Sequence, residues 1–255
     1  MWRRLRSWQG IHLERARDAS ARVVLADGHI GFKGSYGAAL AYFHQQTNAR
    51  HAQAERAVVM VHGLLGDSGN FELLSRALQG QGHAVQHFRY ASCKGYRMSA
   101  DGQLAQLIKR LPPRSAIVAH SLGCRLAAHA LQSASMQPLK LVFIAPPASR
   151  VQWARRGNKL GPVRSFLGTS LTDLADHPMP MTGLRTHDLL VIEGRSDGQR
   201  SDGWLTSQET QMAVPHKREI VQASHSDLTH APATRAAVLK HLEGGDLSHD
   251  QARRR

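Results

Sequence analysis

The sequence predicts an α/β fold in which a mostly parallel central sheet is covered by helices on both faces. Between residues 57 and 145, short apolar segments alternate with segments of helical spacing, which is the pattern of right-handed strand–helix–strand crossovers. The segment 57–61 is apolar at every position, as expected for a strand buried on both faces of a parallel sheet. A chain of 255 residues is long enough for one such domain with a full core.

The first 20 residues are basic and predict a short helix followed by a linker. Trp2, Leu5 and Trp8 recur near helical spacing, so one face of this helix would be apolar. Such a face either packs on the domain or lies on a membrane surface, and we expect packing. No apolar run has the length of a signal-peptide core or of a membrane span.

The other elements follow from apolar runs, from helical spacing and from turn residues. Strands are predicted at residues 22–25, 29–32, 40–43, 57–61, 83–90, 116–119, 139–145, 188–193 and 218–222. Helices are predicted at residues 71–78, 100–111, 122–133 and 234–242, and a polar loop at 45–55.

Residues 146–186 interrupt this alternation and predict a small cap or lid. The stretch contains five prolines, several basic residues and a small apolar set. We therefore expect one domain at residues 21–245 that carries this insertion, after the basic segment 1–20. Residues 246–255 are polar and are expected to form a disordered tail.

One stretch, 115–128, predicts a strand, a sharp turn and a helix with Ser121 at the apex of the turn. The apolar run ends abruptly before Ser121, and a segment rich in Ala and Leu follows. A turn this tight needs small residues two positions before and two positions after the apex, where the sequence has Ala119 and Gly123. The pattern favours a nucleophile elbow, and the alternative is a serine N-cap on a buried helix.

A nucleophilic serine needs an imidazole base and a carboxylate that orients the base. We expect both on loops after later strands, with the acid before the histidine. His225 lies nearer than His230 to the end of the last predicted strand and is the expected base, with His230 as its rival. Asp197 and Asp202 both follow the strand at 188–193, and the residues alone leave the choice of acid open.

An oxyanion hole needs two backbone N–H groups aimed at the developing negative charge. The N–H of Leu122, directly after the serine, is the first expected donor. The loop after residues 57–61 contains Gly63 and Gly66, which let the backbone turn back over the sheet, and Leu64 is the second expected donor. We expect His62 to hold this turn and assign it no catalytic role.

Three separated motifs resemble the α/β-hydrolase superfamily over roughly residues 20–245. They are Val59-Met60-Val61-His62-Gly63-Leu64-Leu65-Gly66, Ala119-His120-Ser121-Leu122-Gly123 and the late Asp and His. Ala119 stands where the usual pattern has glycine. Within the superfamily, the chain is similar to bacterial lipases and esterases of the inositol-deacylase branch, on the motifs Asp202-Gly203-Trp204-Leu205 and His225-Ser226-Asp227-Leu228.

This resemblance implies a serine esterase or lipase of α/β-hydrolase fold. Ser121 would be the nucleophile, His225 the base and Asp202 the acid, with Asp197 as the alternative acid. A thioesterase or an amidase would use the same residues with another leaving group. A non-catalytic binding protein on this scaffold usually lacks the nucleophile, the base or an oxyanion glycine, and all of these are present in the sequence.

The charge of the chain suggests what it contacts. Lys and Arg number 33 against 19 Asp and Glu, for a formal charge of +14, which attracts anionic surfaces. No nucleic-acid-binding motif occurs, so we expect no nucleic-acid partner. The charge then serves either general solubility or a loose attraction to an anionic membrane surface. We expect a small-molecule or lipid ester substrate.

The two cysteines, Cys93 and Cys124, fit a reducing compartment better than a disulfide framework. We therefore expect a cytoplasmic protein, at most peripheral to a membrane. No metal ion and no organic cofactor is implied by the sequence.

Overall fold

The computed structural model describes residues 2–8, 11–51, 56–93, 97–132, 139–196 and 198–244. The strands are β1 (Arg3–Trp8), β2 (Ile11–Arg15), β3 (Ser20–Val24), β4 (Ile30–Ser35), β5 (Ala57–Val61), β6 (Ala84–Phe88), β7 (Ala116–His120), β8 (Lys140–Ile144), β9 (Asp188–Arg195) and β10 (Lys217–Gln222). The α-helices are α1 (Tyr36–His51), α2 (Glu72–Gly80), α3 (Arg97–Ile108), α4 (Leu122–Gln132), α5 (Gln152–Asn158), α6 (Gly161–Leu167), α7 (Thr169–Asp176) and α8 (Pro232–Glu243). Short 3-10 helices are η1 (Ser68–Phe71), η2 (Thr182–Leu184) and η3 (Asp227–Thr229).

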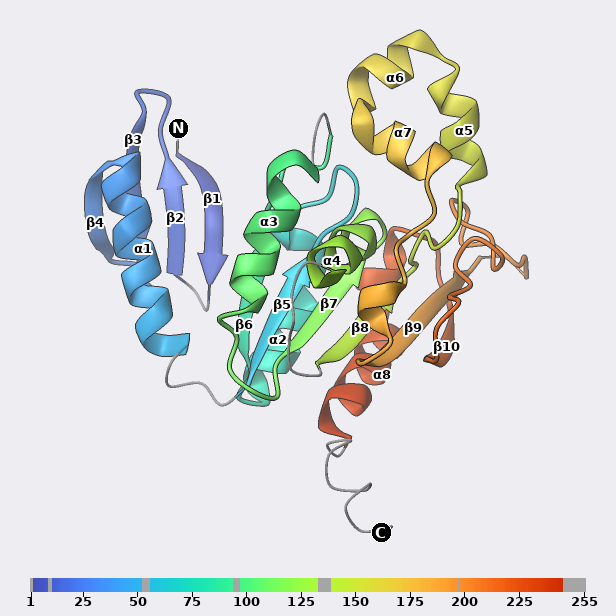
Figure 1. The fold of residues 1–255 in the computed structure, drawn as a ribbon. Helices are drawn as coiled ribbons and strands as arrows, with labels where there is room; N and C mark the ends of the chain where they lie inside the picture. Colours follow the sequence, from blue (N-terminus) through green and yellow to red (C-terminus); the bar gives the residue numbers. More distant parts are fainter. Residues whose placement is uncertain are drawn as a thin grey trace.

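All strands join one sheet in the order β10-β9-β8-β7-β5-β6-β1-β2-β3-β4 (Figure 1). The six strands from β5 to β10 run parallel, and β1 to β4 extend the sheet in antiparallel pairs beyond β6. Helices α3 and α4 cover one face of the parallel strands, and α2 and α8 lie on the other (Figure 1). The predicted fold class, an α/β-hydrolase fold with a mostly parallel sheet, is therefore confirmed.

The parallel strands lie inside the main core because their side chains are apolar on both faces. Every residue of β5 and β7 is buried, and so are the last four residues of β8. Helix α4 is buried along most of its length between the sheet and its neighbours. The elements predicted from residue 57 to residue 242 are all present, with ends that differ by at most three residues.

The prediction of a helix in residues 1–20 is wrong, because β1 and β2 form an antiparallel pair there. In β2 the buried and partly exposed positions alternate, with Ile11 and Leu13 facing the core, and this period of two is that of a strand. Trp2 lies under the Arg22 guanidinium, which is 4.5 Å from the centre of the indole ring. No amphipathic surface helix forms from this segment.

The strand predicted at 40–43 and the loop predicted at 45–55 are also wrong, since α1 extends to residue 51. Ala39 and Phe43, four residues apart, are both buried and pack with side chains of β2 and β3 in a second, smaller core. The helical period therefore outweighs the strand preference of neighbouring aromatic residues. Residues 52–55 lie outside the described part of the chain.

Residues 146–186 contain α5, α6, α7 and η2 between β8 and β9. In Figure 1 the three α-helices lie beyond the carboxyl ends of the parallel strands, and we call residues 146–186 the cap. The tail predicted at 246–255 lies outside the described residues. Within the described ranges, no helix combines the length and apolar character that crossing a bilayer requires.

Candidate active site

Ser121 occupies the tight turn between β7 and α4. Its φ of 52° is in the left-handed region, which a non-glycine residue adopts only under local constraint. Its N–H donates to the carbonyl of Ile144 at 2.9 Å, which ties the turn to β8. At Gly123 an added Cβ would lie 2.4 Å from the carbonyl oxygen of Val61, so only glycine fits the close approach of α4 to the end of β5.

His225 connects Ser121 to Asp202. Its Nε2 lies 3.0 Å from the Ser121 Oγ, and its Nδ1 lies 2.7 Å from Oδ2 of Asp202. Because a carboxylate only accepts hydrogen bonds, Nδ1 carries the proton and Nε2 of the neutral ring is left to accept from the serine hydroxyl. This arrangement can withdraw a proton from Ser121.

The loop after β9 holds Asp202 in a buried, well-bonded position. Its Oδ1 accepts from the N–H groups of Trp204 at 2.9 Å and Leu205 at 2.7 Å, and its own carbonyl accepts from the N–H of His225 at 2.9 Å. Burial alone would raise the pKa of the Asp202 carboxyl, but the hydrogen bond and charge of His225, with the two N–H donors, hold that pKa below its ordinary value. Asp202 is therefore ionised at neutral pH.

The structure separates the candidate residues that the sequence left open. The rival base, His230, is exposed, and no contact joins it to Ser121 or Asp202 within the described residues. The alternative acid, Asp197, lies outside the described residues. Ser121, His225 and Asp202 are the set that the fold brings together.

The loop after β5 lies against Ser121. A Cβ added at Gly63 would lie 3.0 Å from the Cβ of Ser121. In this loop the N–H of Leu65 donates to Ser92 Oγ at 2.9 Å and the N–H of Gly66 donates to the Gly63 carbonyl at 3.2 Å. By contrast, the N–H groups of the two expected oxyanion donors, Leu64 and Leu122, have no acceptor among the described residues.

His62 supports this loop in the way its position suggested. Its Nδ1 lies 2.9 Å from the carbonyl of Gly63, and its ring stacks on Tyr90 with centroids 4.5 Å apart. Burial lowers its pKa below the ordinary histidine value, so the ring is neutral and serves as a rigid support.

Two tryptophans next to His225 were not recognised from the sequence. Trp204 stacks on the His225 ring, and Trp153 from α5 meets Trp204 edge to face with ring centroids 5.0 Å apart. Trp204 is 51% exposed, and Nε1 of Trp153 is buried without a partner among the described residues. The approach to the base is therefore walled by indole rings, one of them from the cap. In the sequence, the signal for Trp204 was its position two residues after Asp202, next to Gly203.

A buried arginine that the sequence analysis also passed over fastens the cap. The guanidinium of Arg125, in α4, donates to the carbonyls of Pro147, Ser149, Asp173 and His177 at 2.7–3.0 Å. It also lies 3.4 Å from the Asp173 carboxylate. The sequence signal for this role was that Arg125 is the only Lys, Arg, Asp or Glu in the otherwise apolar helix after Ser121.

No His, Cys, Asp or Glu cluster suited to a metal ion occurs in the described ranges.

Comparisons with known proteins agree with this arrangement. A family model described as "Alpha/beta hydrolase family" matches residues 58–252, which is more than half of the chain. The comparison with curated proteins gives no match.

Several solved structures share the fold at low sequence identity. An esterase from Exiguobacterium antarcticum is 14% identical, with TM-score 0.57 over 74% of this chain and 92% of that chain. A pyrethroid hydrolase from Sphingobium faniae JZ-2 is 14% identical, with TM-score 0.55 over 74% and 98%. The type II thioesterase BorB from the borrelidin biosynthetic cluster is 18% identical, with TM-score 0.51 over 73% and 91%. At these identities the likeness shows the fold alone.

Proposed function

This chain belongs to the alpha/beta hydrolase family, and we propose that it is a serine hydrolase that cleaves carboxylic esters through an acyl-enzyme on Ser121. The observation that carries the proposal is the pair of contacts made by His225, 3.0 Å to Ser121 Oγ and 2.7 Å to the Asp202 carboxylate. A serine hydroxyl becomes a useful nucleophile only when such a base is held in the correct tautomer.

In the first half of the reaction, Ser121 Oγ attacks the ester carbonyl while His225 Nε2 takes the hydroxyl proton. The carbonyl oxygen becomes an oxyanion, which the N–H groups of Leu64 and Leu122 stabilise. When the tetrahedral intermediate collapses, the bond between the carbonyl carbon and the alkoxy oxygen breaks. His225 gives its proton to the departing alcohol, and the acyl group stays on Ser121.

In the second half, water takes the place of the alcohol. His225 removes a proton from the water, whose oxygen attacks the acyl carbon through a second oxyanion. Collapse releases the carboxylic acid and returns the proton to Ser121. Asp202 remains ionised throughout and stabilises the imidazolium that forms twice in the cycle.

The leaving group and acyl chain are the finer part of the proposal. The indole rings of Trp153 and Trp204 beside His225 favour an apolar substrate portion at this side of the site. The likeness of the Asp202 and His225 motifs to lipases and esterases of the inositol-deacylase branch favours an ester over a thioester or amide.

We also propose that the cap binds anionic membrane surfaces. Its residues 150–172 contain five exposed cations and no acidic residue, and the cations are Arg150, Arg155, Arg156, Lys159 and Arg164. Leu160 and Phe166 in the same stretch are 57% and 63% exposed. Exposed apolar side chains among cations are typical of surfaces that bind anionic lipid. Sedimentation with anionic vesicles, and failure to sediment with zwitterionic ones, is the expected result.

The function is tested with p-nitrophenyl esters from acetate to palmitate and with matched thioester and anilide substrates. We expect ester cleavage, and a loss of at least about 1000-fold in kcat for Ser121→Ala. Ser226→Ala, next to His225 but exposed, is the matched control and should stay active. Ester cleavage retained by Ser121→Ala would overturn the mechanism, and a higher kcat/KM on the thioester would favour a thioesterase.

A further inference from the structure

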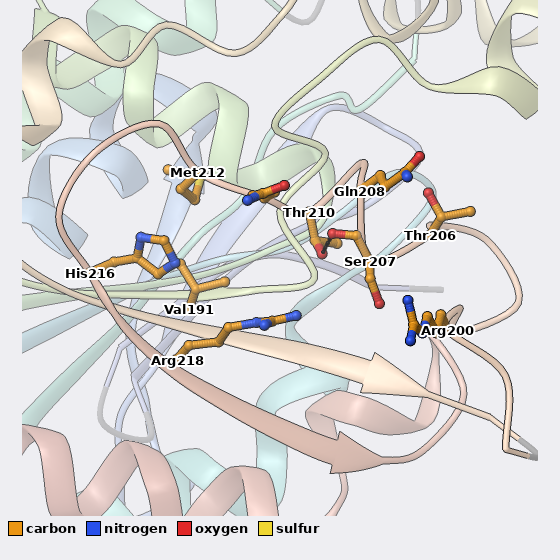
Figure 2. Close-up of a pocket in the computed structure, with 10 residues that line it drawn as sticks. Val191, Arg200, Thr206, Ser207, Gln208, Thr210, Met212, His216 and Arg218 are labelled. Atoms are coloured by element: carbon orange, nitrogen blue, oxygen red, sulfur yellow. Dashed lines mark hydrogen bonds between the residues drawn. The ribbon is translucent and has the colours of Figure 1, made fainter.

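A pocket lies at the edge of the sheet, away from the candidate active site, and neither Ser121 nor His225 lines it. It has a volume of about 500 Å3 and is formed by β9, β10 and the loop between them, which also carries Asp202 (Figure 2). Polar groups that line it include Arg200, Thr206, Ser207, Gln208, His216 and Arg218. A pocket of this size accommodates a small organic molecule.

The pocket has more positive than negative charge. Arg218 pairs with Glu193, and Arg195 contacts the same carboxylate with its Nε at 3.1 Å. Ser207 donates its hydroxyl to Glu193 at 2.5 Å, and Glu193 is only 2% exposed. Arg200 and Arg218 both line the pocket, and no carboxylate is among its described lining residues. Glu193 already has Arg195, Arg218 and Ser207 as partners.

Arg200 supplies hydrogen-bond donors that no described protein group uses. Its guanidinium makes no hydrogen bond or ion pair in the described part of the chain. Figure 2 shows the guanidinium groups of Arg200 and Arg218 on opposite sides of Ser207. Such planar donor groups bind carboxylate and phosphate oxygens in pairs.

His216 lies on the opposite side of the pocket from Arg200 (Figure 2). Its Nδ1 lies 2.7 Å from the carbonyl of Val214, so Nδ1 carries a proton and Nε2 is left as the free ring nitrogen. Val191 and Met212 supply apolar surface for the carbon portion of a ligand.

The pocket adjoins the hairpin that presents Asp202. Residues 200–207 are closed by the Ser207 N–H, which donates to the Arg200 carbonyl at 2.9 Å, and by a bridge between Ser201 and Thr206. Asp202 lies inside this hairpin, and the pocket is lined by both of its ends. A ligand that joins Arg200 to Arg218 would fasten the hairpin to β10.

We propose that this pocket binds a small organic phosphate or carboxylate, with its anionic group between Arg200 and Arg218, and that the bound anion steadies the hairpin that holds Asp202. This site is separate from the ester-cleaving residues. Its ligand is therefore an effector and not the substrate.

Binding is measured on the full chain at constant ionic strength by titration with phenyl phosphate, inorganic phosphate, benzoate and neutral benzamide. The phosphates are followed by 31P NMR and all four probes by calorimetry. We expect saturable binding of phenyl phosphate and benzoate and none of benzamide. Tighter binding of phenyl phosphate or of benzoate identifies the anionic group that the pocket prefers.

Arg200→Gln should weaken binding of the preferred anion at least tenfold, because it removes the unpartnered guanidinium. Arg218 is a poorer test position, since its loss leaves buried Glu193 short of a partner. Arg110→Gln removes the same charge from an exposed position after α3 and should bind like the wild type. The site would be overturned if Arg200→Gln and Arg110→Gln bound the anion equally well. It would also be overturned if binding disappeared when the background salt was exchanged for a chloride salt at the same ionic strength.

The effect on the hairpin is read from amide hydrogen exchange, independently of ester cleavage. A saturating anion should slow exchange of the Ser207 and Leu205 N–H groups at least threefold in the wild type and not in Arg200→Gln. Unchanged exchange under saturating ligand would refute the coupling to Asp202, even if the anion binds.

Discussion

The indole ring of Trp204 lies nearly parallel to the imidazole ring of His225, with centroids 5.8 Å apart and 20° between the ring planes. The backbone N–H of Trp204 is bonded to Asp202 at the same time. The ring that lies against the base is therefore positioned by the acid that orients the base. With half of its surface exposed, Trp204 can contact both His225 and a substrate.

Replacing Trp204 with alanine should raise KM for long-chain or aromatic esters about tenfold, since it removes apolar contact surface worth roughly 1.4 kcal/mol. Acetate esters are too short to use this wall and should be cleaved with nearly unchanged KM. Trp204→Phe keeps an aromatic ring and should recover most of the loss. KM and kcat measured across the chain-length series check this, and an equal loss of kcat on every ester would instead mean that Trp204 only positions His225.

Asp202→Asn should lower kcat by about three to four orders of magnitude. An amide has only one oxygen, which cannot accept both from the Trp204 and Leu205 N–H groups and from the Nδ1 proton. The NH2 group would therefore face Nδ1 and favour the wrong tautomer of His225. The neutral amide also does not stabilise the imidazolium. Asp197→Asn is the matched variant in the same loop and should reduce kcat less than tenfold. Steady-state kinetics of the pair at pH 8 decide the assignment, and a mild effect in Asp202→Asn would show that another group serves His225.

Arg125→Leu should destabilise the protein by about 3–5 kcal/mol, because it removes the ion-pair partner of the buried Asp173 carboxylate and the donor for several buried carbonyls. Arg125→Lys keeps the charge without the branched set of donors and should recover only part of this loss. Urea unfolding gives the free energies. Limited proteolysis should cut residues 150–180 faster in Arg125→Leu, and unchanged cutting would show that Arg125 does not fasten the cap.

The parallel core was predictable because its signals are local. The strand 57–61 is apolar throughout. The turn at Ser121 is predicted because an apolar run ends there between two small residues, Ala119 and Gly123. In a parallel sheet the carboxyl ends of the strands meet at one edge. Residues that follow separate strands, such as Asp202 and His225, are therefore predicted from the sequence to lie close together.

The N-terminal strands and the contacts made by single side chains were not predictable in this way. In residues 1–15 the period-two pattern of Ile11 and Leu13 is too short to outweigh the tryptophan spacing before it. The partners of Arg125 lie 22 to 52 positions later in the chain, and no local pattern specifies them. The stack of Trp204 on His225 depends on how a loop closes, which periodicity does not describe.

His120 gives the protein a specific sensitivity to acid. Its ring is buried, lies against His225 with centroids 4.8 Å apart and donates from Nε2 to the His225 carbonyl at 3.1 Å. Burial, with the nearby His225, lowers the pKa of His120 from 6.5 to about 3. Between pH 6.5 and about pH 3, His120 is protonated in the unfolded chain but neutral in the folded chain. The free energy of unfolding therefore falls as the pH falls through this range.

The free energy lost through His120 is about 1.4 kcal/mol per pH unit, or about 2 kcal/mol between pH 6.5 and 5. His120→Gln has no group to protonate, so the difference in unfolding free energy between pH 7 and pH 5 should shrink by about this amount. Comparing each variant with itself at two pH values removes any general cost of the substitution. His29→Gln, at an exposed position, should keep the wild-type difference in urea unfolding. If His120→Gln keeps it as well, the acid sensitivity arises from other groups, and half-buried His87, whose pKa is lowered to about 4, is the first to examine.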